Sequence, residues 1–172
     1  MKIAGQLNEF KSDRILDSKE VRKLDDFSIY AIAASLEAVH MSGLDLEKIN
    51  PDRVGVTIGT GVGGIKTMEE QHNIIEKRGA RRVSPQFVPR MIANIAGGHL
   101  SMRFGFQGPN QTVTSACASA TDAIGIAMRL IISGDADVMI TGGTEASITP
   151  LTIAGFANMN ALSKNNSNPQ EA

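Results

Sequence analysis

The chain has 172 residues, 42% hydrophobic and 20% charged, with a formal net charge of −1; these values indicate one folded domain and exclude a disordered chain. The balanced charge disfavours a nucleic-acid partner. No apolar run reaches the roughly 18 residues of a membrane helix, and residues 1–10 have no continuous apolar core, so we expect no membrane partner and no secretory signal. The single cysteine excludes an internal disulfide and a multi-cysteine zinc site, and it favours a reduced, cytoplasmic location.

The first predicted elements are a strand and a long helix. Residues 2–7 are expected to form a short strand. Asp17, with Glu20 three positions further on, resembles a capping box. It begins a helix predicted over residues 18–42, which Gly43 ends.

A strand, a glycine-rich segment and further helices are predicted next. Residues 53–58 predict a buried strand, followed by residues 59–64 (GTGVGG), here called the glycine run. A helix is predicted over residues 65–77. Pro89 suits the first turn of another helix, which runs to about Phe104.

The most regular stretch is a strand, a helix and a second strand. Residues 111–116 predict a strand and residues 117–133 a helix. That helix is apolar on nearly all sides, so we expect it to be buried. Residues 137–141 predict another strand, which residues 142–143 break. This alternation of strands and helices favours an α/β fold with a mainly parallel sheet.

Cys117 is the candidate nucleophile. It lies in residues 114–120 (TSACASA), where a strand ends and a helix begins. Free amide groups and the positive end of the helix dipole stabilise an anion there, and the thiolate is the nucleophilic form of cysteine. The amide of Cys117 could also help to bind an oxyanion. The alternative is an inert buried cysteine, and the local pattern leaves both open.

The three histidines do not supply an obvious general base. They are His40, His72 and His99. None has a motif-like context, so a cysteine–histidine protease arrangement is not supported.

The glycine run matches the dinucleotide-binding pattern G-x-G-x-x-G between a strand and a helix. The acidic residue expected about 20 positions further on is missing, because residues 77–82 form a basic loop instead. The alternative is a glycine-rich strand end that lets a substrate chain pass close to the backbone.

Basic side chains form two clusters in the sequence. The three residues of the first are spaced i, i+3 and i+4, which places them on one face of a helix, and the three residues of the second lie in a loop. Their members are Lys19, Arg22 and Lys23, and Arg78, Arg81 and Arg82. Such local positive patches suit an acidic protein partner or a phosphate, and the alternative is an ordinary solvated face.

Three segments together resemble one family. They are residues 84–89 (SPQFVP), 112–125 (TVTSACASATDAIG) and 134–156 (GDADVMITGGTEASITPLTIAGF). They resemble the β-ketoacyl-acyl-carrier-protein synthases, most closely the synthase II type of bacterial fatty-acid synthesis. The glycine run and residues 160–172 fit the same family, so the resemblance covers essentially the whole chain.

The resemblance implies a thiolase-like fold with α-β-α-β-α layers, in which residues 1–172 are a partial N-terminal β-ketoacyl synthase domain. It implies an acyltransferase that condenses an acyl chain, held as a cysteine thioester, with malonyl-acyl-carrier protein and releases carbon dioxide. The implied partners are acyl-carrier protein, acyl and malonyl thioesters, and a second copy in a homodimer of the full-length protein. No cofactor and no metal are implied.

The resemblance also assigns roles to single residues. Cys117 matches the nucleophile, and its amide matches part of the oxyanion hole. Val62 matches the gate of the acyl pocket, Phe87 a residue near the pocket floor at the dimer interface, and Phe156 a residue on the approach to the cysteine. Five residues match basic positions that receive the carrier protein: Lys19, Arg22, Lys23, Arg81 and Arg82.

The departures from the family concern length. Family members open with a strand ahead of the position of Met1, and beyond that of Ala172 they carry two catalytic histidines, a lysine and a glycine–phenylalanine loop. We therefore expect an incomplete fragment that cannot complete the condensation. The alternatives are another enzyme of the same fold, such as a thiolase or a polyketide ketosynthase, a non-catalytic interaction fragment, and a dinucleotide-binding protein.

Overall fold

A computed structural model describes residues 3–12 and 15–172. Its helices and strands, in chain order, are α1 (Ser18–Val21), α2 (Asp26–Ser42), β1 (Val54–Gly59), α3 (Ile65–Arg78), α4 (Phe87–Met91), α5 (Ile95–Phe104), β2 (Asn110–Val113), α6 (Ser119–Ile132), β3 (Val138–Gly143) and α7 (Pro150–Asn158). Short 3₁₀ turns cover Pro51–Arg53, Ala80–Arg82, Ala116–Ala118 and Pro169–Glu171.

The strands form one parallel sheet of order β2-β1-β3. Both partners of β1 run parallel to it, with Thr57 beside Gln111 on one side and beside Thr141 on the other. The central strand β1 is buried along its whole length, as expected for a strand covered on both faces. The predicted α/β class with a parallel sheet is confirmed.

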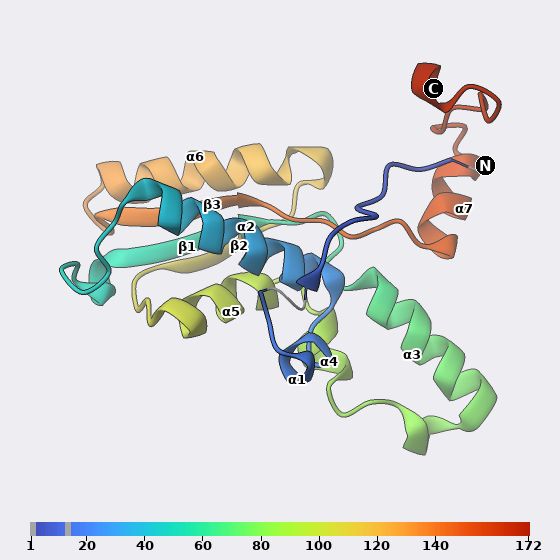
Figure 1. Cartoon of the computed structure of the whole chain (residues 1–172), viewed down its shortest axis with the longest axis horizontal. Coiled ribbons are helices and arrows are strands. Elements are labelled where there is room, and N and C mark those ends of the chain that lie inside the picture. The colour runs from blue at the N-terminus through green and yellow to red at the C-terminus, as the bar shows by residue number, and fades with distance from the viewer. Residues whose placement is uncertain (1–2, 13–14) are drawn as a thin grey trace.

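One face of the sheet carries the main hydrophobic core. Alternate residues of a strand point to the same face, so Val54, Val56 and Ile58 lie together. They pack with side chains of α2 and α5, among them Phe27 and Leu100, which are fully buried. In Figure 1, α5 lies below the strands, α2 crosses in front of them, and α6 lies above them.

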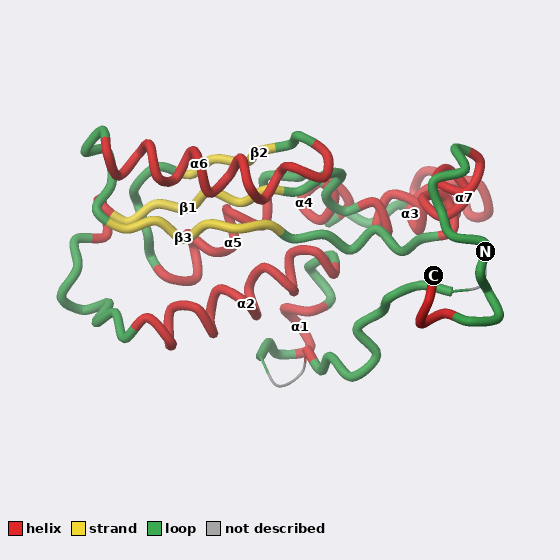
Figure 2. The backbone as a smooth tube through the Cα atoms, turned by 90° about the horizontal axis from the view of Figure 1, so that it is seen from above, coloured by secondary structure: helices red, strands yellow, loops and turns green. Residues whose placement is uncertain are grey.

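The opposite face of β1 is lined by small residues, namely Gly55, Thr57 and Gly59. The helix α6 lies close against this face, and its buried side chains are small as well: Ser119, Ala123 and Ala127. Small residues on both surfaces let the helix axis approach the sheet closely. Figure 2 shows α6 running along the strands from end to end.

The prediction of one helix over residues 18–42 is wrong, because two helices form there. The capping box is confirmed: the Asp17 carboxylate accepts the amides of Lys19 and Glu20 at 2.7 and 2.8 Å. The helix α1 nevertheless ends after one turn, and the Asp25 side chain caps a second helix by accepting the Phe27 amide at 3.4 Å. Aspartate competes with the helical backbone in this way and favours a helix start over a helix interior.

Two other predicted elements also differ. Residues 3–7 form no strand, and residue 2 lies outside the described residues. The helix predicted from Pro89 to Phe104 is divided into α4 and α5, because the Met91 carbonyl at the end of α4 accepts the Gly64 amide at 3.0 Å. The predicted end of α2 is confirmed, since Gly43 takes the left-handed conformation with φ 67°.

The prediction that α6 is buried on all sides is also wrong. Its apolar residues Ile124, Met128 and Ile132 are 53%, 57% and 75% exposed. The sheet covers one face of α6, and in the described part of the chain no other element covers the face on which these residues lie. In the same part of the chain, no helix is long and apolar enough to cross a membrane.

A half-buried histidine on α5 predicts a pH dependence of stability. Burial lowers the pKa of His99, and the Glu20 carboxylate opposes this shift more weakly. The folded chain therefore binds fewer protons than the unfolded chain just below the ordinary histidine pKa of about 6.5. Stability is full above that pH and falls as the pH drops below it.

The substitution His99→Gln removes this titration. We expect the denaturant midpoint of the variant to fall less than that of the wild type between about pH 7 and pH 5. His72→Gln, on the exposed surface of α3, is the matched control and should follow the wild type. Equal pH profiles for His99→Gln and the wild type would contradict the prediction.

Candidate active site

The carboxyl ends of the three parallel strands meet at one edge of the sheet. These ends are Gly59, Val113 and Gly143, and Gly59 pairs with both of the others. Two further hydrogen bonds join the edge: the Thr60 amide donates to the Val113 carbonyl at 3.0 Å, and the Thr144 amide to the Gly59 carbonyl at 2.9 Å. The segments that follow the three strands therefore converge, at the position where open α/β sheets usually bind ligands.

Cys117 lies at this edge, in a turn of residues 115–118, here called the cysteine turn. The Ala118 amide closes the turn by donating to the Ser115 carbonyl at 3.1 Å. Ala116 has a left-handed conformation with φ 51°, which costs a non-glycine residue of order 1 kcal/mol or more. This conformation reverses the chain and leaves the free Cys117 thiol exposed just before α6.

Ser119 holds the cysteine turn in this conformation. Its side chain is buried, and its hydroxyl donates to the Ala116 carbonyl at 2.7 Å and accepts the Ser115 amide at 2.9 Å. The Ser115 hydroxyl in turn donates to the Asp122 carboxylate in the first turns of α6. These bonds offset the backbone strain at Ala116 and tie Cys117 to the start of the helix.

Removing the Ser119 hydroxyl is expected to destabilise the chain. Ser119→Ala removes both hydrogen bonds of this hydroxyl, to the Ser115 amide and the Ala116 carbonyl, and each such bond contributes about 0.5–1.5 kcal/mol. Ser133→Ala is the matched control, since its exposed hydroxyl at the other end of α6 bonds only to its close neighbours Leu130 and Asp135, and its loss should stay within about 0.5 kcal/mol. Urea unfolding measures both values, and equal stabilities of the two variants would contradict the role of Ser119.

A hollow of about 290 Å³ opens beside the thiol. Three segments line it: the beginning of the glycine run, the residues around the cysteine turn, and the chain after β3. Its lining residues are Gly59, Thr60, Gly61, Ala116, Cys117, Ser119, Ala120, Gly143, Thr144 and Glu145.

The glycines of this region allow the backbone to pack against itself. A Cβ at Gly59 would lie 2.2 Å from the Ser119 carbonyl oxygen, and one at Gly64 would lie 2.4 Å from the Arg90 carbonyl oxygen. A side chain at either position would force backbone apart. The protein's own packing thus accounts for both glycines, without a nucleotide or a passing substrate chain.

Glu145 is a site residue that the sequence analysis missed. One carboxylate oxygen accepts the Gly61 amide at 2.7 Å, and the other accepts the Thr60 hydroxyl at 3.3 Å. The sequence did contain a signal for it, because Glu145 comes shortly after the strand predicted over residues 137–141 and therefore lies at the edge where parallel strands converge. Within residues 3–12 and 15–172, no group of three or more His, Cys, Asp or Glu side chains could hold a metal ion.

The three predicted pocket residues lie in different parts of the fold. Val62 is exposed and follows Gly61, which lines the hollow. Phe156, on α7, lines a second hollow of about 390 Å³ that shares Glu145 with the first. Phe87 is half-buried on α4, outside the residues that line the hollow beside Cys117.

The predicted basic residues are all exposed, and they form separate patches. The predicted helix face at residues 19–23 does not form, because α1 ends at Val21, so that Arg22 is its C-cap and Lys23 lies in the following turn. Arg81 and Arg82 lie in the 3₁₀ turn after α3. Figure 1 shows the carboxyl end of α3 far from α1.

Fold and site together define an α/β protein that presents a single cysteine on a strained turn, at the carboxyl edge of a parallel sheet and at the start of a helix. Comparison with known proteins identifies the family. Residues 5–172 match the family model described as "Beta-ketoacyl synthase, N-terminal domain". The chain belongs to this family.

Curated relatives narrow the resemblance further. The chain is 47% identical over 163 residues to the 3-oxoacyl-[acyl-carrier-protein] synthase 2 of Staphylococcus aureus, which covers 95% of this chain and 40% of the relative. It is 43% identical over 171 residues to the protein of the same name from Synechocystis, covering 99% and 41%. The chain therefore spans about 40% of the length of these relatives.

Solved ketosynthase structures share the fold. One is a ketosynthase of a type II polyketide synthase in complex with its acyl-carrier protein, with a TM-score of 0.85, 28% identity, and coverage of 91% of this chain and 45% of that one. A β-ketoacyl synthase from Burkholderia phymatum has a TM-score of 0.83 and 27% identity, covering 95% and 40%. The predicted thiolase-like fold is confirmed by these neighbours.

Proposed function

We propose that this chain is the acyl-accepting part of a 3-oxoacyl-acyl-carrier-protein synthase of type II, which elongates fatty acids. The observation that carries the proposal is the exposed Cys117 thiol on its strained turn at the start of α6. The 47% identity to the staphylococcal synthase supports fatty-acid elongation over polyketide synthesis, whose neighbour is 28% identical.

The first half of the reaction is acyl transfer to the thiol. The Cys117 thiolate attacks the carbonyl carbon of an acyl thioester, a new carbon–sulfur bond forms, and the carrier leaves as its thiol with the proton that Cys117 has lost. Developing negative charge on the carbonyl oxygen lies at the start of α6, where we place the Cys117 amide in the oxyanion hole.

The second half is the condensation. Malonyl-acyl-carrier protein loses carbon dioxide, and the resulting carbanion attacks the Cys117 thioester, which yields a 3-oxoacyl-carrier and restores the thiolate. We assign the decarboxylation to residues of a longer enzyme, because the relatives extend well beyond the matched 40%. The exposed apolar face of α6 is suited to pack against such a further part, as a second layer over the helix.

The pocket residues keep the roles that the resemblance implies. Val62, between two glycines beside the hollow, would gate the acyl pocket. Phe156 would line the approach to Cys117, since its hollow shares Glu145 with that of the thiol. Phe87, apart from the hollow, would approach the pocket floor at the interface of a cytoplasmic homodimer. No cofactor takes part in this proposal.

Acyl-carrier protein is the proposed donor, and mass spectrometry tests the transfer. The complete protein encoded by the gene is mixed with acyl-carrier protein bearing a fatty acyl chain, and its intact mass is followed with time. A gain of one acyl group that maps to Cys117 is the expected result. An unmodified protein, under conditions in which the staphylococcal relative is acylated, would contradict the proposed function.

The basic residues predict how the carrier is recognised. Arg81 and Arg82 are exposed, and their replacement by glutamate should raise the KM for acyl-carrier protein about tenfold by repelling an acidic partner. Transfer from a small acyl thioester without a carrier should be unchanged. Lys48→Glu, an exposed charge after α2, is the matched control. An equal KM for all variants would show that these arginines do not contribute to binding of the carrier.

A further inference from the structure

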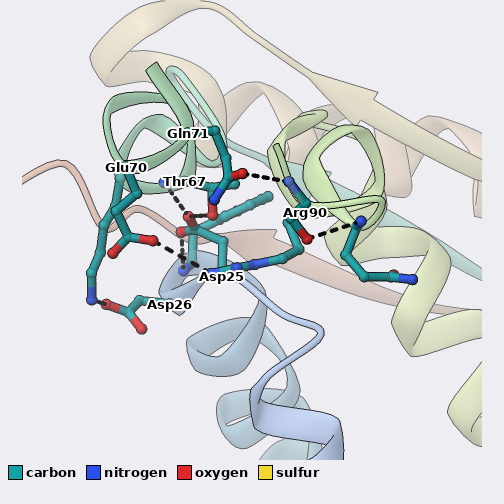
Figure 3. Close-up of polar contacts among 10 residues, drawn as sticks. Asp25, Asp26, Thr67, Glu70, Gln71 and Arg90 are labelled. Carbon is teal, nitrogen blue, oxygen red and sulfur yellow. Dashed lines mark hydrogen bonds and ion pairs between the residues drawn. The ribbon is translucent and has the colours of Figure 1, made fainter. Parts of the chain in front are cut away.

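The carboxylate of Asp25 is buried where α2, α3 and α4 meet, next to the start of α3, which follows the glycine run. Asp25 is only 2% exposed. Its Oδ2 accepts both the Thr67 amide at 3.0 Å and the Thr67 hydroxyl at 2.6 Å, and its Oδ1 accepts the Phe27 amide at 3.4 Å. Figure 3 shows Asp25 at the centre of this cluster, with the side chain of Thr67 directed at it.

Asp25 caps two helices at once. The N-cap of α3 is Gly64, which has no side chain to accept the free amides of the first turn. The Asp25 carboxylate supplies that acceptor from 42 positions away, at Thr67, and it also caps its own helix α2. Negative charge at the start of α3 is favoured by the helix dipole as well.

Only a carboxylate satisfies this position. The two backbone amides that it meets, of Phe27 and Thr67, can only donate, so both side-chain oxygens of residue 25 must accept. The amide of an asparagine would turn a donor toward one of these two donors. Asp26, one position further on, makes instead a partly exposed ion pair with Lys66 at 2.6 Å.

The contact between Asp25 and Thr67 fixes the far end of the glycine run. The run passes directly into α3 at Gly64, and its near end is held by Glu145, which accepts the Gly61 amide at 2.7 Å. Val62 lies between these two fixed ends. The position of α3 therefore sets where Val62 lies relative to Cys117.

The segments that carry the basic patches are tied to the same helix. Asp25 follows Lys23 by two residues. The Gln71 side-chain oxygen, buried on α3, accepts the Ser84 amide at 2.7 Å, which ties the chain after Arg82 to α3. The helix α3 thus contacts both the segments that we assign to carrier binding and the glycine run that we assign to the acyl chain.

We infer that Asp25 is a positioning residue for acyl acceptance, which acts through Thr67 to hold the glycine run and Val62 in the place that a long acyl chain needs at Cys117. This inference rests on the proposed function. It predicts that loss of the contact slows the transfer of a long acyl chain but leaves the thiol itself equally reactive toward a small reagent.

The experiment compares two rates in the complete protein encoded by the gene. One is acylation of Cys117 by acyl-carrier protein bearing a long acyl chain, and the other is alkylation of Cys117 by iodoacetamide, which needs no acyl pocket. In Asp25→Asn and Thr67→Val, acylation should fall at least about tenfold, since small misplacements of reacting groups have effects of this size or larger. Alkylation should stay within about twofold of the wild type.

Two matched variants complete the design. Thr67→Ser retains the hydroxyl and should restore acylation, and Asp26→Asn removes a neighbouring charge and should behave as the wild type. Where Asp25→Asn does not fold, Thr67→Val carries the test. If Thr67→Val is acylated as fast as the wild type, or loses acylation and alkylation equally, the inference is wrong. The proposed function stands in either case, provided that the wild type is acylated. A wild type that is not acylated overturns both.

Discussion

Replacement of Cys117 by alanine is expected to abolish acylation of the protein completely. Cys117 is the one cysteine of residues 1–172, so no other thiol of this part of the enzyme can take over the acyl group. Alanine keeps the small volume of the cysteine turn, and the left-handed residue Ala116 and the bonds of Ser119 are unaffected. The loss would therefore report the missing sulfur and not a missing fold.

The measurement is the intact mass of the complete protein after incubation with acyl-carrier protein, together with its unfolding curve in urea. Cys117→Ser is the second variant, since a hydroxyl without an activating base is a much weaker nucleophile than a thiolate. We expect acylation of the serine variant to be slower by orders of magnitude, with unchanged stability. Acylation of Cys117→Ala at the wild-type rate would place the nucleophile elsewhere and overturn the proposed mechanism.

The sequence predicted the order of the elements well and their boundaries less well. Hydrophobic strands and helix caps are local signals, so β1, α3, β3 and the ends marked by Asp17 and Gly43 could be found. The break before α2 depends on Asp25, whose main partner Thr67 lies 42 positions away. No periodicity within residues 18–42 reports such a contact, and a continuous helix was the natural local prediction.

The burial of α6 shows a different limit. The composition of a helix reports which side chains favour burial, but not which element covers them. Ala123 and Ala127 are buried against the sheet as expected, whereas Ile124 and Met128 remain exposed because the described chain offers nothing to cover them. The apolar pattern thus predicted that α6 needs packing partners on all sides, and the structure shows that the sheet provides them on one face.

For the site, the sequence could identify the nucleophile candidate but not the groups that hold it. Cys117 is marked by its place between a strand and a helix, which is a local feature. Ser119 and Glu145 act through bonds to the cysteine turn and to the glycine run, and only the folded backbone brings these atoms together. The glycine run illustrates the same point, because its match to a nucleotide motif reflects close backbone packing.

Gly59→Ala is expected to lower both the stability of the fold and the rate of acylation, although it does not change the nucleophile itself. The new Cβ would lie 2.2 Å from the Ser119 carbonyl oxygen and 2.7 Å from the Ala120 amide nitrogen. Both neighbours are backbone at the start of α6, so no side chain can turn away to make room. Either β1 or α6 must shift, and overpacking of this kind costs about 3 kcal/mol, the upper end of the usual range.

The same shift would move the cysteine turn, because Ser119 holds both Ser115 and Ala116. We therefore expect Gly59→Ala to lower both the urea midpoint and the acylation rate. Gly98→Ala is the matched control: on α5 the nearest heavy atom, Ile95 Cδ1, lies 3.9 Å from the new Cβ. Alanine in a helix with room for it should stabilise by about 0.5–1 kcal/mol. A Gly59→Ala variant as stable as Gly98→Ala would show that α6 does not rest on β1 as closely as the packing at Gly59 requires.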